Sequence, residues 1–205
     1  MKSLLFLIAL ASLGFGNLAH AQCNTAFNEI CIFFSQECSE CVNCLEIGPG
    51  IATFYVVLNN PTQHSGVTGY EFCLTNADGS TFPPSPGVSI QSVILPPDAI
   101  NFGSPPCFAV GFGSPVPWSP CITLAAINLE ILVTQPLCFG VKPADFPSII
   151  GHMSYLDGSN EPVIMFPNNG IDAPDYNMAC FNSPECSPIV GVEARSWGML
   201  KSLYR

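Results

Sequence analysis

The stretch Ile51–Thr75, IATFYVVLNNPTQHSGVTGYEFCLT, decides the fold expected for this chain. It consists of two extended apolar runs on either side of a polar segment that contains Asn60, Pro61 and Gly66. Pro61 has no N–H to donate to a β-ladder, so it ends the first run, and Asn and Gly favour turn geometries. The stretch therefore predicts two antiparallel strands that pair with each other at the centre of a β-sandwich.

The two runs differ in how their side chains alternate. In the first run both faces are apolar, with Phe54 on one face and Tyr55 on the other, which is typical of a central strand. In the second run Phe72 alternates with Glu71 and Cys73. That alternation predicts a strand with one buried face and one face toward solvent.

The rest of the chain repeats this pattern of short alternating runs between residues that favour turns. Pro and Gly number 20 and 17, high for a helical protein. A helix is the alternative for the run 121–134, which is rich in Leu and Ala, but its period of two and its flanking prolines favour a strand. The expected fold is an all-β, antiparallel β-sandwich of about nine strands. The further strands are expected at Glu29–Ser35, Val88–Leu95, Ala99–Phe102, Cys107–Phe112, Cys121–Thr134, Leu137–Val141, Ile149–Tyr155 and Pro162–Phe166.

The amino terminus has the pattern of a secretory signal peptide. Lys2 precedes an apolar run, and Ala19-His20-Ala21 has the small residues of a cleavage site. Cleavage after Ala21 would leave a sandwich domain over residues 22–176, a Cys- and Pro-containing linker over 177–191 and a basic tail over 192–205. No later run reaches eighteen apolar residues, so no membrane span is expected.

Charge is divided unevenly along the chain. Between residues 22 and 191 there are fourteen acidic residues and a single basic one, Lys142. The last fourteen residues carry one acid against Arg195, Lys201 and Arg205. The acidic body should repel nucleic acid, which excludes that class of partner.

The cysteines indicate a disulfide-stabilised exported protein. All lie after the predicted cleavage site, and their odd number leaves at least one thiol without an intramolecular partner. Cys38-x2-Cys41-x2-Cys44 also has the spacing of metal or iron–sulfur ligands, but no fourth ligand is suitably placed, so a loop closed by disulfides is favoured and no cofactor is expected. The disulfide candidates are Cys23, Cys31, Cys38, Cys41, Cys44, Cys73, Cys107, Cys121, Cys138, Cys180 and Cys186.

Signals for catalysis are weak. The expected mature chain has two histidines, His64 and His152, and lacks the G-x-S-x-G motif of α/β-hydrolases. A pair of carboxylates, as in glycosidases, is the alternative, and Glu71 and Glu130 are the acids in mid-strand positions. No catalytic residue is assigned, and a non-enzymatic protein is expected.

Two kinds of loop feature suggest ligands. The oxygen-rich turns Asn76–Ser80 and Asp157–Glu161 offer ligands of the kind that Ca²⁺ prefers, although both are also good turn sequences and no metal is assigned. Phe112, Trp118 and Phe146 lie in Pro- and Gly-rich segments. They would form either a ligand-binding rim or a cover over the open ends of the sandwich.

The last fourteen residues, V-E-A-R-S-W-G-M-L-K-S-L-Y-R, form either a short amphipathic helix or a frayed terminus. They resemble a terminal tag shared by many bacterial secreted proteins of unassigned activity. The runs TFYVVLNNP and GYEFCL resemble strands of those proteins, whose bodies are similar to Ig-like and cohesin-like sandwiches. The resemblance implies export, with the tail as a sorting or surface-attachment signal. The sorting candidates are Trp197, Gly198, Lys201, Leu203, Tyr204 and Arg205.

Together these features predict a secreted, non-catalytic β-sandwich module with a binding or structural role at the cell surface. Its partner would be an extracellular protein or glycan, and the export machinery would read the tail. The alternative is a secreted carbohydrate-active enzyme or carbohydrate-binding module.

Overall fold

The computed structural model describes residues 26–36, 43–83, 87–167 and 178–184. These ranges confirm the all-β expectation, because they contain no α-helix and residues 121–131 form a strand. No helix within them is long and apolar enough to cross a membrane. The strands are β1 (Glu29–Phe33), β2 (Cys44–Leu45), β3 (Gly50–Asn59), β4 (Val67–Asn76), β5 (Val88–Ile94), β6 (Ala99–Asn101), β7 (Cys107–Val116), β8 (Cys121–Ile131), β9 (Leu137–Lys142), β10 (Met153–Asp157), β11 (Pro162–Pro167) and β12 (Ala179–Phe181).

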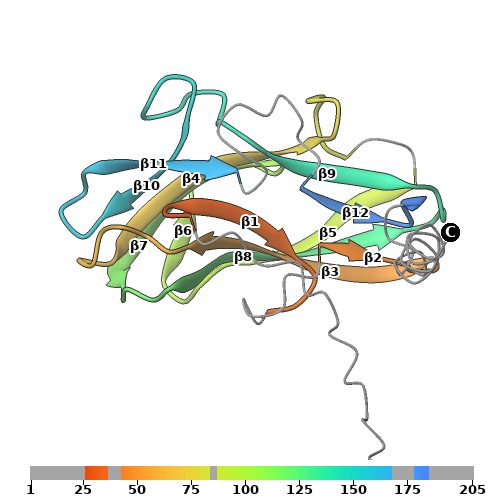
Figure 1. The fold of residues 1–205 in the computed structure, drawn as a ribbon, viewed down its shortest axis with the longest axis horizontal. Helices are drawn as coiled ribbons and strands as arrows, with labels where there is room; N and C mark the ends of the chain where they lie inside the picture. Colours follow the sequence, from red (N-terminus) through yellow and green to blue (C-terminus); the bar gives the residue numbers. More distant parts are fainter. Residues whose placement is uncertain (1–25, 37–42, 84–86, 168–177, 185–205) are drawn as a thin grey trace, which may run out of the picture.

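The strands form two layers, which we call sheet A and sheet B (Figure 1). Sheet A has the order β5-β8-β3-β1, with every pair antiparallel. In sheet B, β4 is central: β7 and then β6 lie on one side of it, and β10 and β9 pair with successive parts of its other side. β11 continues from β10, while β12 and β2 continue from β9.

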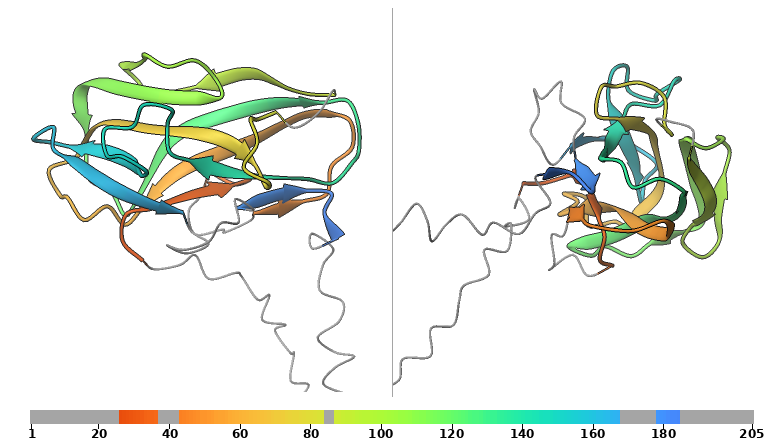
Figure 2. Two further views of the ribbon diagram at one scale, coloured as in Figure 1. Left: turned by 90° about the horizontal axis from the view of Figure 1, so that it is seen from above. Right: turned by 90° about the vertical axis from the view of Figure 1, so that its right-hand side faces the viewer.

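The two layers are joined along both long edges. At one edge β11 pairs in parallel with β1, where Glu29 lies opposite Phe166. At the other edge, the chain turns from β5 in sheet A to β6 in sheet B (Figure 2, left, yellow-green). The β1–β11 and β2–β12 pairs are parallel, so the sandwich is not antiparallel throughout as the sequence predicted.

β3 and β4 do not pair with each other, so the predicted central hairpin is wrong. β3 lies between β1 and β8 in sheet A, whereas β4 lies in sheet B. The connection over residues 60–66 is too long for a tight hairpin turn and crosses the distance of about 10 Å between packed sheets. Gly66 has φ +94°, and a Cβ there would lie 2.6 Å from the carbonyl oxygen of Val116, so this crossing requires glycine.

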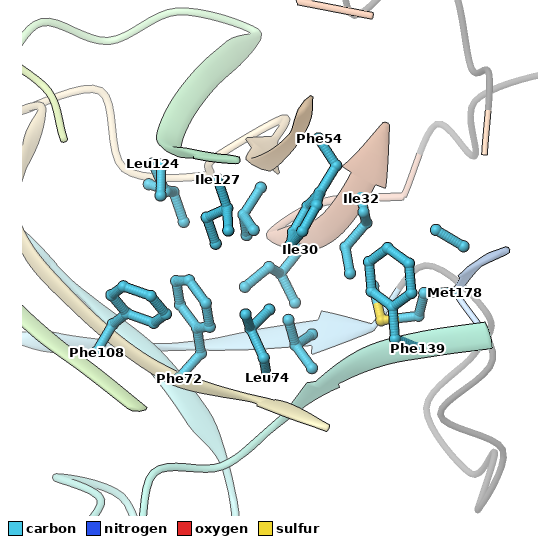
Figure 3. Close-up of a cluster of buried hydrophobic side chains, with 14 of the residues drawn as sticks. Ile30, Ile32, Phe54, Phe72, Leu74, Phe108, Leu124, Ile127, Phe139 and Met178 are labelled. Atoms are coloured by element: carbon cyan, nitrogen blue, oxygen red, sulfur yellow. The ribbon is translucent and has the colours of Figure 1, made fainter. Parts of the chain in front are cut away.

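The inner faces of the two sheets supply one hydrophobic core (Figure 3). Ile30, Phe54 and Ile127 from sheet A face Phe72 and Phe139 from sheet B, and all five are fully buried. The alternation of β8 changes phase at Leu124, where the pairing register with β3 shifts between Val56 and Val57. This β-bulge explains why apolar and polar side chains in the run 121–134 alternate regularly only from Ala125 onward.

The sandwich continues beyond residue 176, where the sequence placed its end. β12 lies within the predicted linker 177–191 and pairs with β9, and its Phe181 is 1% exposed. β2 and β12 have two and three residues, too few for an alternating pattern to be recognised. The predicted signal peptide 1–21 and tail 192–205, with all six sorting candidates, lie outside the described residues.

Candidate functional site

Glu71 on β4 projects from the outer face of sheet B, yet it is only 9% exposed. The sequence placed it in solvent as an ordinary outward-facing acid, and this expectation is wrong. Its neighbours on β4, Cys73 and Thr75, are completely buried as well. The residues between β9 and β10, 143–152, lie over this face, which the alternation within β4 alone could not reveal (Figure 1, teal).

Three hydrogen bonds hold the Glu71 carboxylate. Its Oε1 accepts from the backbone N–H of Ser148 at 2.6 Å and from the hydroxyl of Ser154 at 2.7 Å. Its Oε2 accepts from the Ser148 hydroxyl at 3.1 Å. Ser154 lies directly opposite Glu71 on β10, and Ser148 belongs to the 143–152 connection. Because a buried carboxylate is costly without partners, these bonds fix the connection on the sheet.

A hollow of about 210 Å³ opens beside this carboxylate, and we call it the Glu71 hollow. It exists because two of its lining residues on β7, Ala109 and Gly111, have small side chains or none. A Cβ at Gly111 would lie 3.3 Å from the ring of Phe102, so a larger residue would push that ring aside. Its lining residues are Tyr70, Glu71, Phe102, Ala109, Val110, Gly111, Ser148, Ser154 and Leu156.

A second hollow, of about 430 Å³, shares Phe102 and Ala109 with the first. Its lining includes Phe146 and the disulfide-bonded Cys107. Large apolar side chains are exposed around the two hollows: Phe102 is 77% exposed and Phe146 95%. Ile100 is 60% exposed and lies opposite Gly111, on the same outer face. We call the two hollows and these exposed side chains the sheet B face.

The second predicted acid, Glu130, lies far from this face. It is on β8, where its Oε2 accepts from Gln91 Nε2 at 2.6 Å and from the Ser89 hydroxyl at 3.3 Å, both on neighbouring β5. Its neighbours Leu129 and Ile131 point into the core, so Glu130 points out of sheet A. Glu71 and Glu130 therefore lie on opposite outer faces and cannot flank one glycosidic bond, which needs two carboxylates about 5 to 9.5 Å apart.

Of the eleven cysteines, seven fall within the described residues. Two disulfides join directly paired residues of adjacent strands, Cys73–Cys107 between β4 and β7 and Cys138–Cys180 between β9 and β12. Cys44 and Cys121 are also disulfide-bonded. Cys31 is a free thiol, 1% exposed, and burial, with a contribution from the Glu29 carboxylate, raises its pKa. Cys23, Cys38, Cys41 and Cys186 lie outside the described residues.

The candidate metal ligands among the described residues already have other partners. Cys73, Cys107 and Asp145 form the one group of three candidate ligands found there, and its two sulfur atoms are already joined in a disulfide. In the turn Asp157–Glu161, Asp157 Oδ1 accepts from the N–H groups of Ser159 and Glu161. In the other turn, hydrogen bonds from Ser80 lower the pKa of Asp78. Both carboxylates thus close their own turns.

The three loop aromatics do not form one rim. Phe112 packs against the core and lies 5.8 Å from the ring of Tyr70. Trp118 stacks on His64 at 4.5 Å and donates a hydrogen bond from Nε1 to the carbonyl oxygen of Pro61, covering the β3–β4 connection. Only Phe146 borders the sheet B face. Phe102, which sequence reasoning missed, is an apolar residue just before Gly103, a position that could have marked it as a loop aromatic.

Comparisons with known proteins give structural similarities only. No family profile and no curated protein sequence match the chain. A non-cellulosomal cohesin from Archaeoglobus fulgidus is 8% identical with a TM-score of 0.44, covering 69% of this chain and 86% of that one. The seventh ScaB type I cohesin from Pseudobacteroides cellulosolvens is 13% identical with a TM-score of 0.41, covering 68% and 84%. The type II cohesin dyad of the ScaA scaffoldin from Acetivibrio cellulolyticus is 14% identical with a TM-score of 0.43, covering 78% and 50%.

Proposed function

We propose that this chain is an exported, non-catalytic β-sandwich module that binds a partner protein outside the cell through the sheet B face. The observation that carries the proposal is the exposure of Ile100, Phe102 and Phe146 around two adjoining hollows on one side of the sandwich. Exposed apolar groups gathered on one face, with polar groups between them, are typical of protein-binding surfaces. Glu71 fixes the connection that presents Phe146, so the face is preorganised for binding.

The experiment that tests this surface places a photo-crosslinking amino acid at Phe102 or at Ile51. Ile51 is 63% exposed and lies opposite Glu130 on the outer face of sheet A, so it serves as the matched control. We expect a partner protein to be crosslinked from position 102 and not from position 51. The purified partner should then bind the unmodified chain and lose affinity with the F102A/F146A variant but not with I51A. Equal effects at both positions would contradict the proposed face.

A glycan ligand is the alternative, and a glycan array probed with the same variants distinguishes it. If a glycan binds the unaltered chain and this binding is lost in F102A/F146A, the ligand of the sheet B face is a carbohydrate and not a protein. A carbohydrate-active enzyme built on Glu71 and Glu130 is disfavoured because the two acids lie on opposite sheets. Turnover on a panel of glycans that disappears in both E71Q and E130Q would overturn the non-catalytic assignment.

Export is supported by the signal-peptide pattern of residues 1–21 and by the disulfides within the sandwich. The exported chain should begin at Gln22. When it is unfolded without reductant, it should take up one alkylating group, at Cys31. An amino terminus at Met1, or alkylation at several cysteines, would contradict export through this signal.

The tail from Val192 to Arg205 is proposed as a sorting signal, on the resemblance of its V-E-x-x-S-W-G motif to tags of exported proteins. A chain that ends at residue 191 should be exported but fail to remain at the cell surface. Quantifying surface-bound and released protein tests this. If equal amounts of protein were found at the cell surface with and without the tail, the tail would not be a sorting signal.

A further inference from the structure

The polar side chains of the Glu71 hollow can only accept further hydrogen bonds. The hydroxyls of Ser148 and Ser154 each donate their single hydrogen to the Glu71 carboxylate. Each hydroxyl oxygen then offers only lone pairs toward other groups. A carboxylate has about four acceptor positions, and the three bonds to Glu71 leave one, on Oε2. The hollow therefore calls for a ligand that donates hydrogen bonds.

The charge of the hollow is negative, and its lining, which consists of described residues, supplies no counter-charge. None of the residues that line the hollow, all of them within the described ranges, carries a positive charge. Lys142, which lines the second hollow, donates instead to the carbonyl oxygen of Gly79 at 3.3 Å. A cation that entered the hollow would meet a fixed carboxylate in a largely desolvated position, where charge attraction is stronger than in water.

The walls and the size of the hollow suit a single side chain. Its volume of about 210 Å³ is below the 300 to 1,000 Å³ typical of sites for drug-sized ligands. Phe102 and Leu156 supply apolar wall, against which an aliphatic stem can pack, and the Phe102 ring can also attract a cation. A lysine side chain has this combination of an apolar stem and a donor-only, positively charged tip.

Lysine fits the acceptor geometry better than arginine. A guanidinium group binds a carboxylate best through two parallel bonds, one to each oxygen. Here Oε1 already accepts two bonds, so a two-pronged contact would displace Ser148 or Ser154. An ammonium group is a point charge with three donors, and it can use the free position on Oε2 together with the two serine oxygens. We propose that the Glu71 hollow receives a lysine side chain of the partner protein, an inference that rests on the proposed binding face.

The test titrates the isotope-labelled, oxidised chain with Nα-acetyl-lysine-N-methylamide and follows the amide NMR signals of Ser148 and Ser154. The matching norleucine derivative is the neutral control, and the arginine derivative tests the choice of cation. We expect the lysine derivative to bind about tenfold more tightly than the norleucine derivative, since a charge-assisted hydrogen bond contributes at least that factor. It should also bind more tightly than the arginine derivative, whose two-pronged contact would have to displace Ser148 or Ser154. The preference should be lost in E71Q and kept in E130Q, which removes the same charge from the opposite sheet.

F102A provides a second variant in which the Glu71 hydrogen bonds stay intact, and it should weaken binding of the lysine derivative by removing a wall. Equal binding of the lysine and norleucine derivatives, or a preference for arginine, would overturn the lysine assignment. The binding face itself would still stand if the F102A/F146A variant lost its partner. Binding of the lysine derivative only after removal of residues 192–205 would show that the chain's own tail fills the hollow, and this too would overturn the assignment to a partner.

Discussion

Ser148 donates both its backbone N–H and its hydroxyl to the carboxylate of Glu71, so one acid on β4 fixes a connection that begins 72 residues later in the chain. The hydroxyl of Ser154, which is 1% exposed, completes the arrangement from β10. Phe146 lies two residues before Ser148 and borders the second hollow. The position of an exposed side chain on the sheet B face is thereby tied to a buried carboxylate.

We expect Glu71→Ala to lower the free energy of unfolding by about 3 kcal/mol. The change leaves three donors without their acceptor, and hydrogen bonds to charged groups contribute about 1.5 to 3 kcal/mol each before the groups find substitute partners. Urea unfolding measures the loss. Glu130→Ala removes a more exposed carboxylate and should cost less than about 1 kcal/mol. Equal losses in the two variants would contradict the anchoring role of Glu71.

Phe139→Ala should be among the most destabilising substitutions in the core. Phe139 on β9 is fully buried, and its ring centroid lies 4.9 Å from that of Phe54 in the opposite sheet. It also contacts the rings of Phe34, Phe82 and Phe181. Removing a buried phenylalanine ring typically costs 3 to 5 kcal/mol through lost burial and the cavity left behind.

Phe146→Ala is the matched control, because the same ring is removed from a side chain that is 95% exposed. Its unfolding free energy should stay within about 0.5 kcal/mol of that of the unaltered chain. Thermal and urea unfolding of the two variants measure the contrast. A loss of less than 1 kcal/mol in Phe139→Ala would mean that the aromatic cluster does not hold the two sheets together.

The alternation of side chains predicted where most strands lie, but not which strands pair. β3 and β4 illustrate this limit. An apolar face shows that a strand must be covered, but not which other strand covers it. Pairing of β3 with β8 depends on contacts about 70 residues apart. The seven-residue connection 60–66 is too long for a tight turn, but its length alone does not distinguish a hairpin with a long loop from a crossing between sheets. The burial of Glu71 could not be predicted for the same reason, because the residue that covers it, Ser148, is distant in the sequence.

For the cysteines, the sequence predicts that disulfides form but not which thiol remains free. Their number and the export signal predicted disulfides with at least one thiol left over. Which thiol stays free depends on the fold. Cys31 sits on the outer side of β1 with Phe33 and Val57, away from the β4–β7 and β9–β12 pairs whose opposed cysteines are joined.

Removal of the Cys138–Cys180 disulfide should loosen β12 selectively. In C138A/C180A, we expect a loss of about 2 to 4 kcal/mol, because the bridge closes a loop over a sequence separation of 42 residues. β12 has only three residues and pairs with β9 and the two-residue β2, so the bridge supplies much of its attachment. Hydrogen exchange of Ala179 and Phe181 measures the local effect.

C73A/C107A is the matched comparison for this prediction, since it opens a loop with a separation of 34 residues. It should cost a similar free energy of unfolding while leaving exchange in β12 unchanged. If β12 exchanged equally fast in both variants, its attachment would depend on the whole sandwich rather than on its own bridge.

Cys31 gives the chain a defined dependence of stability on alkaline pH. Burial and the Glu29 carboxylate raise the thiol's pKa in the folded state above its ordinary value of about 8.5. The folded state therefore holds this proton more tightly, and its contribution is complete below pH 8.5 and declines as pH rises above it. Between pH 8 and 9.5 the unfolding free energy should fall by about 1 kcal/mol on this account.

Burial also raises the pKa of Tyr70. The ordinary pKa of tyrosine is about 10, so Tyr70 lowers the unfolding free energy only at higher pH than Cys31 does. Cys31→Ala should be less stable than the unaltered chain near neutral pH but decline less steeply across this window, which urea unfolding at matched pH measures. Parallel declines in the two proteins would show that the buried thiol is not the group that titrates.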